Sequence, residues 1–157
     1  MKQVTQDLIK NSIILNNSCF IQSTGTQYIP VGDGTEVGLL NFLQRADLPI
    51  HHMIHDKQRR VAMMCPHSSA NKFSANLIKN ETDGGGTIYL KGAPEIIVKE
   101  RCGNFCDADG ELVGMNEDVA TRYNNALEKF TKTKGLRVIA FAKLDLDNEA
   151  FEAALTH

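Results

Sequence analysis

The chain has 157 residues and a formal net charge of −2, with 42% apolar and 23% charged residues. This size fits one folded domain with a single hydrophobic core, and the composition is that of an ordinary globular protein rather than a disordered one. The near-neutral charge argues against the broad basic surface that duplex nucleic acid requires, but it leaves room for a small basic pocket.

The first 50 residues are predicted to form two helices separated by a pair of strands. Apolar residues in the first segment recur at the three- and four-residue spacing of an amphipathic helix, and two short β-prone runs follow around a Ser-Thr-Gly turn signal. Asp33 or Thr35 can cap the second helix, and Glu36 suits its positive N-terminal end. These elements are expected at residues 4–16, 18–22, 26–30 and 33–47.

The middle of the chain is predicted to hold two strands, a long loop and a helix. An apolar run stopped by Pro66 is typical of a buried strand. The segment after it is rich in Ser, Asn, Lys and Gly, which favours a loop ending in three consecutive glycines. Beyond the second strand, Pro94 suits the first position of a helix. The expected ranges are 61–65 for the first strand, 66–86 for the loop, 87–91 for the second strand and 94–101 for the helix.

The last third of the chain is predicted to contain a hairpin-type turn, a long helix, a strand and a short final helix. Asn116 can cap the long helix, and Gly135 is typical of the residue that follows a helix C-terminus. The expected ranges are 107–110, 117–134, 137–144 and 148–156.

This order of elements indicates an α/β (α+β) fold, with a mainly antiparallel β-sheet flanked by helices, in a single domain over residues 1–157. No apolar run approaches the roughly 20 residues that a transmembrane helix needs. The four cysteines are scattered along the chain, which favours reduced thiols in a cytosolic protein over a disulfide framework.

Residues 89–97 carry the pattern with the most chemical content. Lys91 ends a predicted strand, and Gly92 would let the backbone approach a ligand without a side chain in the way. The helix that follows Ala93 offers unpaired N–H groups and positive potential, so a lysine here can meet a phosphate or the polar edge of a base. From local spacing alone, a surface lysine before an ordinary strand-to-helix turn is the commoner explanation.

The pentapeptide Lys-Gly-Ala-Pro-Glu that starts at Lys91 resembles the signature of the nucleotide-binding domain of P-type ATPases. Residues 31–40 resemble that family's Gly-x-x-Thr-Glu-x-Ala-Leu segment, and they include Thr35 and Glu36. The resemblance implies that Glu36 helps to fix the adenine end of ATP, which is compatible with its being a helix-start acid stabilised by the helix dipole. Lys134 begins a stretch that resembles the family's Gly-Leu-Arg-x-Leu-Ala-x-Ala strand, in which Arg137 is implied as a phosphate-facing cation.

Residues 54–62 resemble the family's Phe-Ser-x-x-Arg-Lys-x-Met-Ser segment. On this alignment Ile54 takes the place of the adenine-stacking phenylalanine and lacks its aromatic contribution. Arg59 is the basic residue implied near the phosphates, and a solvated charge cluster is the alternative explanation for it.

A second candidate for that segment is Phe73-Ser74, which is followed by Lys79. We disfavour it because an entire hairpin should come between the segment and Lys91.

The landmarks occur in the family's order over roughly residues 5–145. The family's Asp-Lys-Thr-Gly-Thr phosphorylation motif and the P-loop pattern do not occur in the sequence.

The resemblance therefore implies the nucleotide-binding domain of a P-type cation pump, most like the plasma-membrane calcium pumps, and thus a cytosolic domain of an integral membrane protein. The residues implied to bind ATP are Thr35, Glu36, Ile54, Arg59, Lys91, Gly92, Ala93 and Arg137. Mg²⁺ would accompany ATP, and the implied partners are the pump's phosphorylation and actuator domains. No residue of this chain is implied to be catalytic, and no nucleic-acid partner is expected.

Two other classes of function stay open. The same fold could serve as a protein-interaction module that binds no nucleotide. The other is a free-standing metal-binding protein, because His51, His52, His55 and His67 lie near Cys65; their spacing fits no standard zinc pattern, so we assign no metal ligand.

Overall fold

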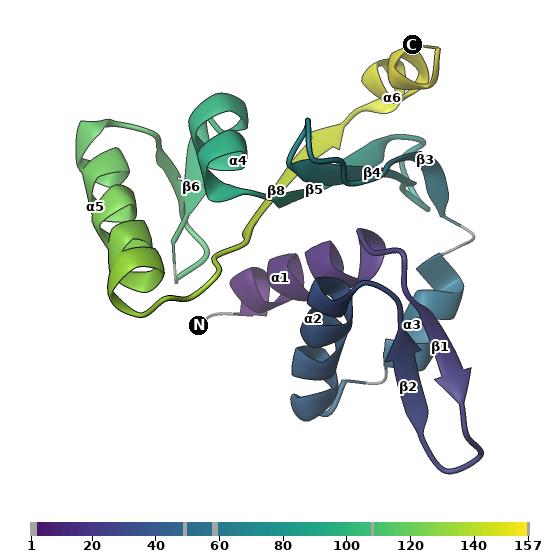
Figure 1. The fold of residues 1–157 in the computed structure, drawn as a ribbon. Coiled ribbons are helices and arrows are strands. Elements are labelled where there is room, and N and C mark those ends of the chain that lie inside the picture. Colours follow the sequence, from purple (N-terminus) through teal and green to yellow (C-terminus); the bar gives the residue numbers. More distant parts are fainter. Residues whose placement is uncertain (1–2, 49, 58–59, 108, 157) are drawn as a thin grey trace.

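A computed structural model describes residues 3–48, 50–57, 60–107 and 109–156 of the chain (Figure 1). The helices are α1 (Gln3–Leu15), α2 (Gly34–Arg45), α3 (Ile50–Lys57), α4 (Pro94–Arg101), α5 (Glu117–Glu128), the short π-helix η1 (Lys129–Thr133) and α6 (Asn148–Leu155). The strands are β1 (Phe20–Ser23), β2 (Tyr28–Val31), β3 (Val61–Cys65), β4 (Phe73–Lys79), β5 (Gly86–Gly92), β6 (Asn104–Cys106), β7 (Leu112–Gly114) and β8 (Ala140–Leu146).

A four-stranded antiparallel sheet of order β3-β4-β5-β8 forms the centre of the molecule. Two separate antiparallel hairpins, β1–β2 and β6–β7, complete the strands. In Figure 1, α1, α2, α3 and the β1–β2 hairpin lie below the sheet, while α4, α5 and β6 lie to its left. The predicted fold class, a mainly antiparallel sheet flanked by helices, is confirmed.

The N-terminal helices share an apolar core that holds them to one another. Its buried members come from α1, α2, α3 and the residues next to them: Ile13, Ile14, Cys19, Leu40, Leu43, Ile50 and Ile54. A smaller cluster of Leu15, Ile78 and Tyr89 packs the end of α1 against the sheet. Helix α1 therefore belongs to both clusters, and its C-terminal end is fixed between the helices and the sheet.

Strand β4 corrects the prediction of a long loop over residues 66–86. Ser and Asn usually mark loops, since their side chains compete with backbone hydrogen bonds. In β4, however, Ser74 and Asn76 are buried side by side on one face, while Phe73, Ala75 and Leu77 take the other. Strand β4 begins at Phe73 and pairs directly with β5, so the β4–β5 hairpin lies between residues 54–62 and Lys91.

Two further elements differ from expectation. Helix α3 occupies the polar segment for which no element was predicted. The predicted buried strand at residues 61–65 exists as β3, but it is an edge strand with Met63 and Met64 exposed.

The predicted helix caps are confirmed. Asp33 accepts hydrogen bonds from the first amides of α2, Asn116 caps α5, and Gly135 has a positive φ of 63°.

Candidate functional site

A cleft of about 1170 Å³ opens where segments from distant parts of the sequence meet. Its walls come from the residues after α1, the start of α2, the β3–β4 loop, the β5–α4 junction, the α5–η1 helices and the segment before β8. Six of the predicted site residues line this one cleft: Thr35, Glu36, Lys91, Gly92, Ala93 and Arg137.

A buried ion pair lies at the centre of the cleft wall. The Nζ atom of Lys91 donates to Oε1 of Glu36 at 2.6 Å and to the backbone carbonyl of Asn16 at 2.6 Å. The two side chains are only 8% and 13% exposed. The ammonium group of Lys91, from β5, meets the C-terminal end of α1, and Glu36 lies in the first turn of α2, so each helix dipole favours the charge that faces it. The charge of Lys91 is thus already balanced within the protein.

The second oxygen of Glu36 is also engaged. Its Oε2 accepts hydrogen bonds from the backbone N–H of Ser18 at 2.9 Å and from the Ser18 hydroxyl at 2.6 Å. Burial by itself would raise the pKa of Glu36, but the hydrogen bonds from Lys91 and Ser18 outweigh burial and lower the pKa below its usual value. Glu36 is therefore held as a carboxylate that links α1, α2 and β5.

Asn16 joins this wall to the sheet beneath it. Its side-chain amide, in a residue that is 2% exposed, donates to the carbonyls of Ser74 and Tyr89, at 3.0 and 2.9 Å, and its Oδ1 accepts from the Ser74 hydroxyl at 3.1 Å. Asn76 similarly donates to the carbonyl of Leu15 at 2.8 Å. The last carbonyls of α1, which lack partners inside the helix, are thus satisfied by side chains from the sheet.

Sequence reasoning missed this polar network. The consecutive Asn-Asn-Ser that follows the first helix was a signal of a capped helix end. The partners of Asn16 lie 58 and 73 residues further along the chain, so their convergence depends on the tertiary fold.

Gly92 has a packing role that differs from the predicted one. A Cβ atom at this position would lie 2.4 Å from the carbonyl oxygen of Lys72 and 2.6 Å from Cα of Phe73. The absence of a side chain therefore lets the backbone at the start of β4 approach. The next residue, Ala93, uses its N–H to donate to the same Lys72 carbonyl at 2.9 Å.

Two exposed cations among the described residues line the cleft, and one of the two was predicted. Arg137 is exposed and has no ion pair with another described residue. Lys72 lies in the β3–β4 loop with its side chain 54% exposed, and its Nζ is 4.0 Å from Glu95. His67, in the same loop, is the one aromatic ring among the described residues that line the cleft. The prediction of a long loop over residues 66–86 gave neither Lys72 nor His67 a place in the nucleotide site.

The segment around residues 54–62 does not contribute to the cleft as expected. Ile54 is 4% exposed and packs in the N-terminal apolar core, because α3 turns this side chain toward α1 and α2. It is not among the residues that line the cleft. Arg59 lies outside the described residues.

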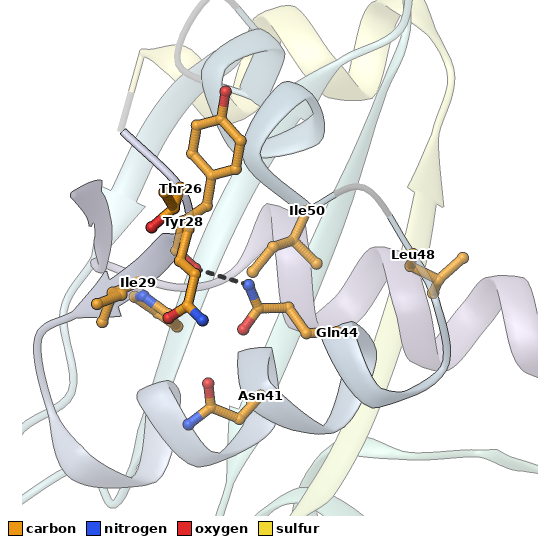
Figure 2. Close-up of a pocket in the computed structure, with 9 residues that line it drawn as sticks. Thr26, Tyr28, Ile29, Asn41, Gln44, Leu48 and Ile50 are labelled. Carbon is orange, nitrogen blue, oxygen red and sulfur yellow. Dashed lines mark hydrogen bonds between the residues drawn. The ribbon is translucent and has the colours of Figure 1, made fainter. Parts of the chain in front are cut away.

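A second pocket, shown in Figure 2, differs in chemistry from the cleft. It has about 460 Å³, lies between the β1–β2 hairpin and the helices α2 and α3, and is bridged by a 2.8 Å hydrogen bond from Gln44 to the Tyr28 carbonyl. Its described lining residues include amide side chains but no charged group. This pocket therefore offers nothing to balance the charge of an anion.

Two other features bear on the class of site. Within the described ranges, no three His, Cys, Asp or Glu side chains are grouped in a way that could hold a metal ion. None of the helices in the part of the chain that the structure describes combines the length and apolar character that crossing a bilayer demands.

Comparison with known proteins agrees with the sequence landmarks. The family model described as P-type ATPase, cytoplasmic domain N, matches residues 4–156. The chain is 28% identical over 156 residues to calcium-transporting ATPase 1 of Lactococcus lactis, which is 99% of this chain and 17% of that protein. It is 28% identical over 149 residues to human plasma membrane calcium-transporting ATPase 4, covering 90% of this chain and 12% of that protein.

A relative from a second transport class is similar to the same degree. The rat sodium/potassium-transporting ATPase subunit alpha-4 is 31% identical over 125 residues, covering 77% of this chain and 11% of that protein. The chain thus spans less than a fifth of the length of these curated relatives. Since the family model matches almost the whole chain, from the first turn of α1 to the end of α6, this chain belongs to the cytoplasmic N domains of the P-type ATPases.

Proposed function

We propose that this chain binds ATP in the cleft, as the nucleotide-binding domain of a P-type cation-transporting ATPase. The observation that carries the proposal is the convergence of Glu36, Lys91 and Arg137 on one cleft, although they lie far apart in the sequence. At about 1170 Å³ the cleft is large enough for a nucleotide, since small-molecule sites commonly measure about 300–1,000 Å³.

The distribution of charge supports an orientation for the nucleotide. The Lys91 ammonium is balanced by Glu36, so this buried wall suits the uncharged base, whose edge can exchange hydrogen bonds with a carboxylate and an ammonium group. The His67 ring could cover a face of the base. Arg137 and Lys72 are exposed and would attract the phosphates. This assignment gives Ile54 no contact with the ligand.

The proposed role in the whole pump is positional. The domain would hold ATP and present its γ-phosphate to an aspartate in a separate phosphorylation domain, with Mg²⁺ neutralising charge on the phosphates, and the actuator domain would be a further partner. No catalytic group is needed from this chain. Calcium is the proposed cation, because the matches to the calcium-transporting relatives quoted above extend over 99% and 90% of the chain, against 77% for the sodium/potassium relative.

Calorimetric titration of the purified chain tests the proposal. ATP and ADP should bind saturably, and tripolyphosphate should bind more weakly because it lacks the base. Arg137→Ala should weaken ATP binding by about tenfold, the loss expected for one charge-assisted contact. Lys99→Ala removes an exposed cation of α4 that does not line the cleft, so it should leave the affinity unchanged.

Equal affinities for ATP and tripolyphosphate, or no binding of either, would favour the interaction module instead. An unchanged ATP affinity in both Arg137→Ala and Lys91→Ala would remove the cleft as the site.

A further inference from the structure

The β3–β4 loop that carries His67 and Lys72 has its own internal structure. The backbone N–H of Lys72 donates to the carbonyl of Ser68 at 2.8 Å, and the N–H of Asn71 donates to the Ser68 hydroxyl at 3.0 Å. Lys72 itself adopts a positive φ of 57°, which a residue with a side chain takes up only when its surroundings stabilise it. The loop is therefore held in one conformation by local hydrogen bonds centred on Ser68.

This loop is docked on the β5–α4 junction at one place. Ala93 N–H donates to the Lys72 carbonyl at 2.9 Å, and Phe73 is paired with Gly92 in the sheet. A Cβ atom on Gly92 would lie 2.4 Å from the Lys72 carbonyl oxygen and 2.7 Å from Cβ of Phe73. The first of these contacts is with a backbone atom, which cannot relieve the clash by changing rotamer as a flexible side chain can. The docked position thus requires glycine at residue 92.

We propose that Gly92 is a positioning residue, which acts through the β3–β4 loop to hold the Lys72 ammonium group at the mouth of the cleft. The proposal rests on the proposed function, because Lys72 is taken to attract the phosphates of a nucleotide. In this proposal Gly92 does not act by letting the backbone approach the ligand. A methyl group at residue 92 would displace the β3–β4 loop, and the Lys72 ammonium group would move with the loop.

Gly86, at the other end of β5, is a matched control. It shows whether β5 tolerates a side chain at a glycine position that is far from the β3–β4 loop. A Cβ on Gly86 would lie 2.4 Å from the ring of Phe151 and 3.0 Å from the carbonyl of Ile78. Gly86 is buried and does not line the cleft. Gly86→Ala therefore introduces comparable crowding in the same strand without touching the loop.

The test is a double-mutant cycle on ATP affinity, measured by calorimetry on the whole chain. Lys72→Gln should weaken ATP binding by about three- to tenfold. Gly92→Ala should weaken it by at least as much, and adding Lys72→Gln to Gly92→Ala should cause less than about a twofold further loss. In the Gly86→Ala background, Lys72→Gln should keep its full effect. Additive losses in the Gly92→Ala background would overturn the proposal, because they would mean that Gly92 acts independently of Lys72.

Amide hydrogen exchange of the chain without nucleotide provides a second readout. The N–H groups of Lys72 and Ala93 should be protected in the wild type and in Gly86→Ala, and they should exchange at least about tenfold faster in Gly92→Ala. Unchanged protection in Gly92→Ala would overturn the proposal even if nucleotide affinity falls. If the wild type shows the protection but does not bind ATP, the function proposed for the cleft fails while the docking of the loop stands.

Ser68→Ala is the milder variant if Gly92→Ala does not fold. It removes the hydroxyl that accepts from Asn71 without introducing a clash. It should weaken ATP binding, and the effect of Lys72→Gln should shrink in its background. A full effect of Lys72→Gln in Ser68→Ala would contradict the role given to the loop.

Discussion

The ion pair between Lys91 and Glu36 predicts a large loss of stability when the carboxylate is removed. In Glu36→Ala, the Lys91 ammonium would stay buried with the Asn16 carbonyl still accepting its hydrogen bond, and two hydrogen-bond donors of Ser18 would lose their acceptor. A charge left without its counter-ion in a buried site is strongly unfavourable, since the low-dielectric surroundings do not solvate it.

The expected magnitude follows from the burial of both partners. With side chains 8% and 13% exposed, the pair belongs to the buried class, for which removal of one partner costs about 3–5 kcal/mol. The Asn16 carbonyl still accepts from Lys91, so we expect the lower end, about 3 kcal/mol. For a domain of this size, that loss corresponds to a decrease in Tm of about 6–12 °C.

Urea denaturation followed by circular dichroism measures the change. Glu36→Ala should lower the midpoint at an unchanged m-value, because the mutation alters stability rather than the surface exposed on unfolding. The double variant Glu36→Leu/Lys91→Met should be more stable than Glu36→Ala, since it leaves no unpaired charge. Glu128→Ala is the matched control: its pair with Lys132 is 2.7 Å long but exposed, and the midpoint should not move.

The reasoning would be refuted if Glu36→Ala cost less than about 1 kcal/mol, the range of a surface ion pair. It would also be refuted if the losses from Glu36→Leu and Lys91→Met, each measured alone, simply added in the double variant. Either result would mean that the two charges are solvated rather than buried.

Two further predictions concern the same wall of the cleft. Because hydrogen bonds lower the pKa of folded Glu36 below its ordinary value of 4.5, its contribution to stability is complete above that pH and is lost as the pH falls through the folded pKa. The urea midpoint of the wild type should therefore decrease below about pH 4.5 more steeply than that of Glu36→Gln; parallel curves would contradict this. Asn16→Asp replaces the amide that donates to Ser74 and Tyr89 with an acceptor, which should cost about 2–3 kcal/mol by urea denaturation, whereas Asn125→Asp on the exposed face of α5 should cost little.

Much of this fold was predictable because its local signals agree with its tertiary structure. Helix α4 has the predicted bounds, with Pro94 at its start, and Asp33, Asn116 and Gly135 act at helix ends as their chemistry predicts. The order of landmarks was also sufficient to place Glu36, Lys91 and Arg137 in one cleft. The helix ends depend on residues that are close in sequence, and the site residues were identified from the resemblance of whole motifs to those of the family.

The β3–β4 region was mispredicted because its structure depends on distant partners. Ser74 and Asn76 signal a loop when read locally, and they fit a buried strand because the end of α1 and the residue after it supply the Leu15 carbonyl and Asn16 as hydrogen-bond partners. Without β4, the loop that brings Lys72 and His67 to the cleft had no defined position. The resemblance of residues 54–62 to the family segment could not show that α3 turns Ile54 into the N-terminal apolar core, away from the cleft.

The buried and the exposed residues of the cleft have different roles. The charges of Glu36 and Lys91 balance each other, and Lys91 also donates a hydrogen bond to the carbonyl of the buried Asn16. These buried residues therefore fix the shape of the wall and add little net charge that could attract an anion. The exposed cations Lys72 and Arg137 contribute little to folding but keep their charge available to a ligand. Exposed charges are also those that salt screens, so nucleotide affinity should depend on ionic strength through these two residues while the stability of the wall should not. The cleft proposed to bind nucleotide can in this way vary its attraction for phosphates without altering the packing that defines it.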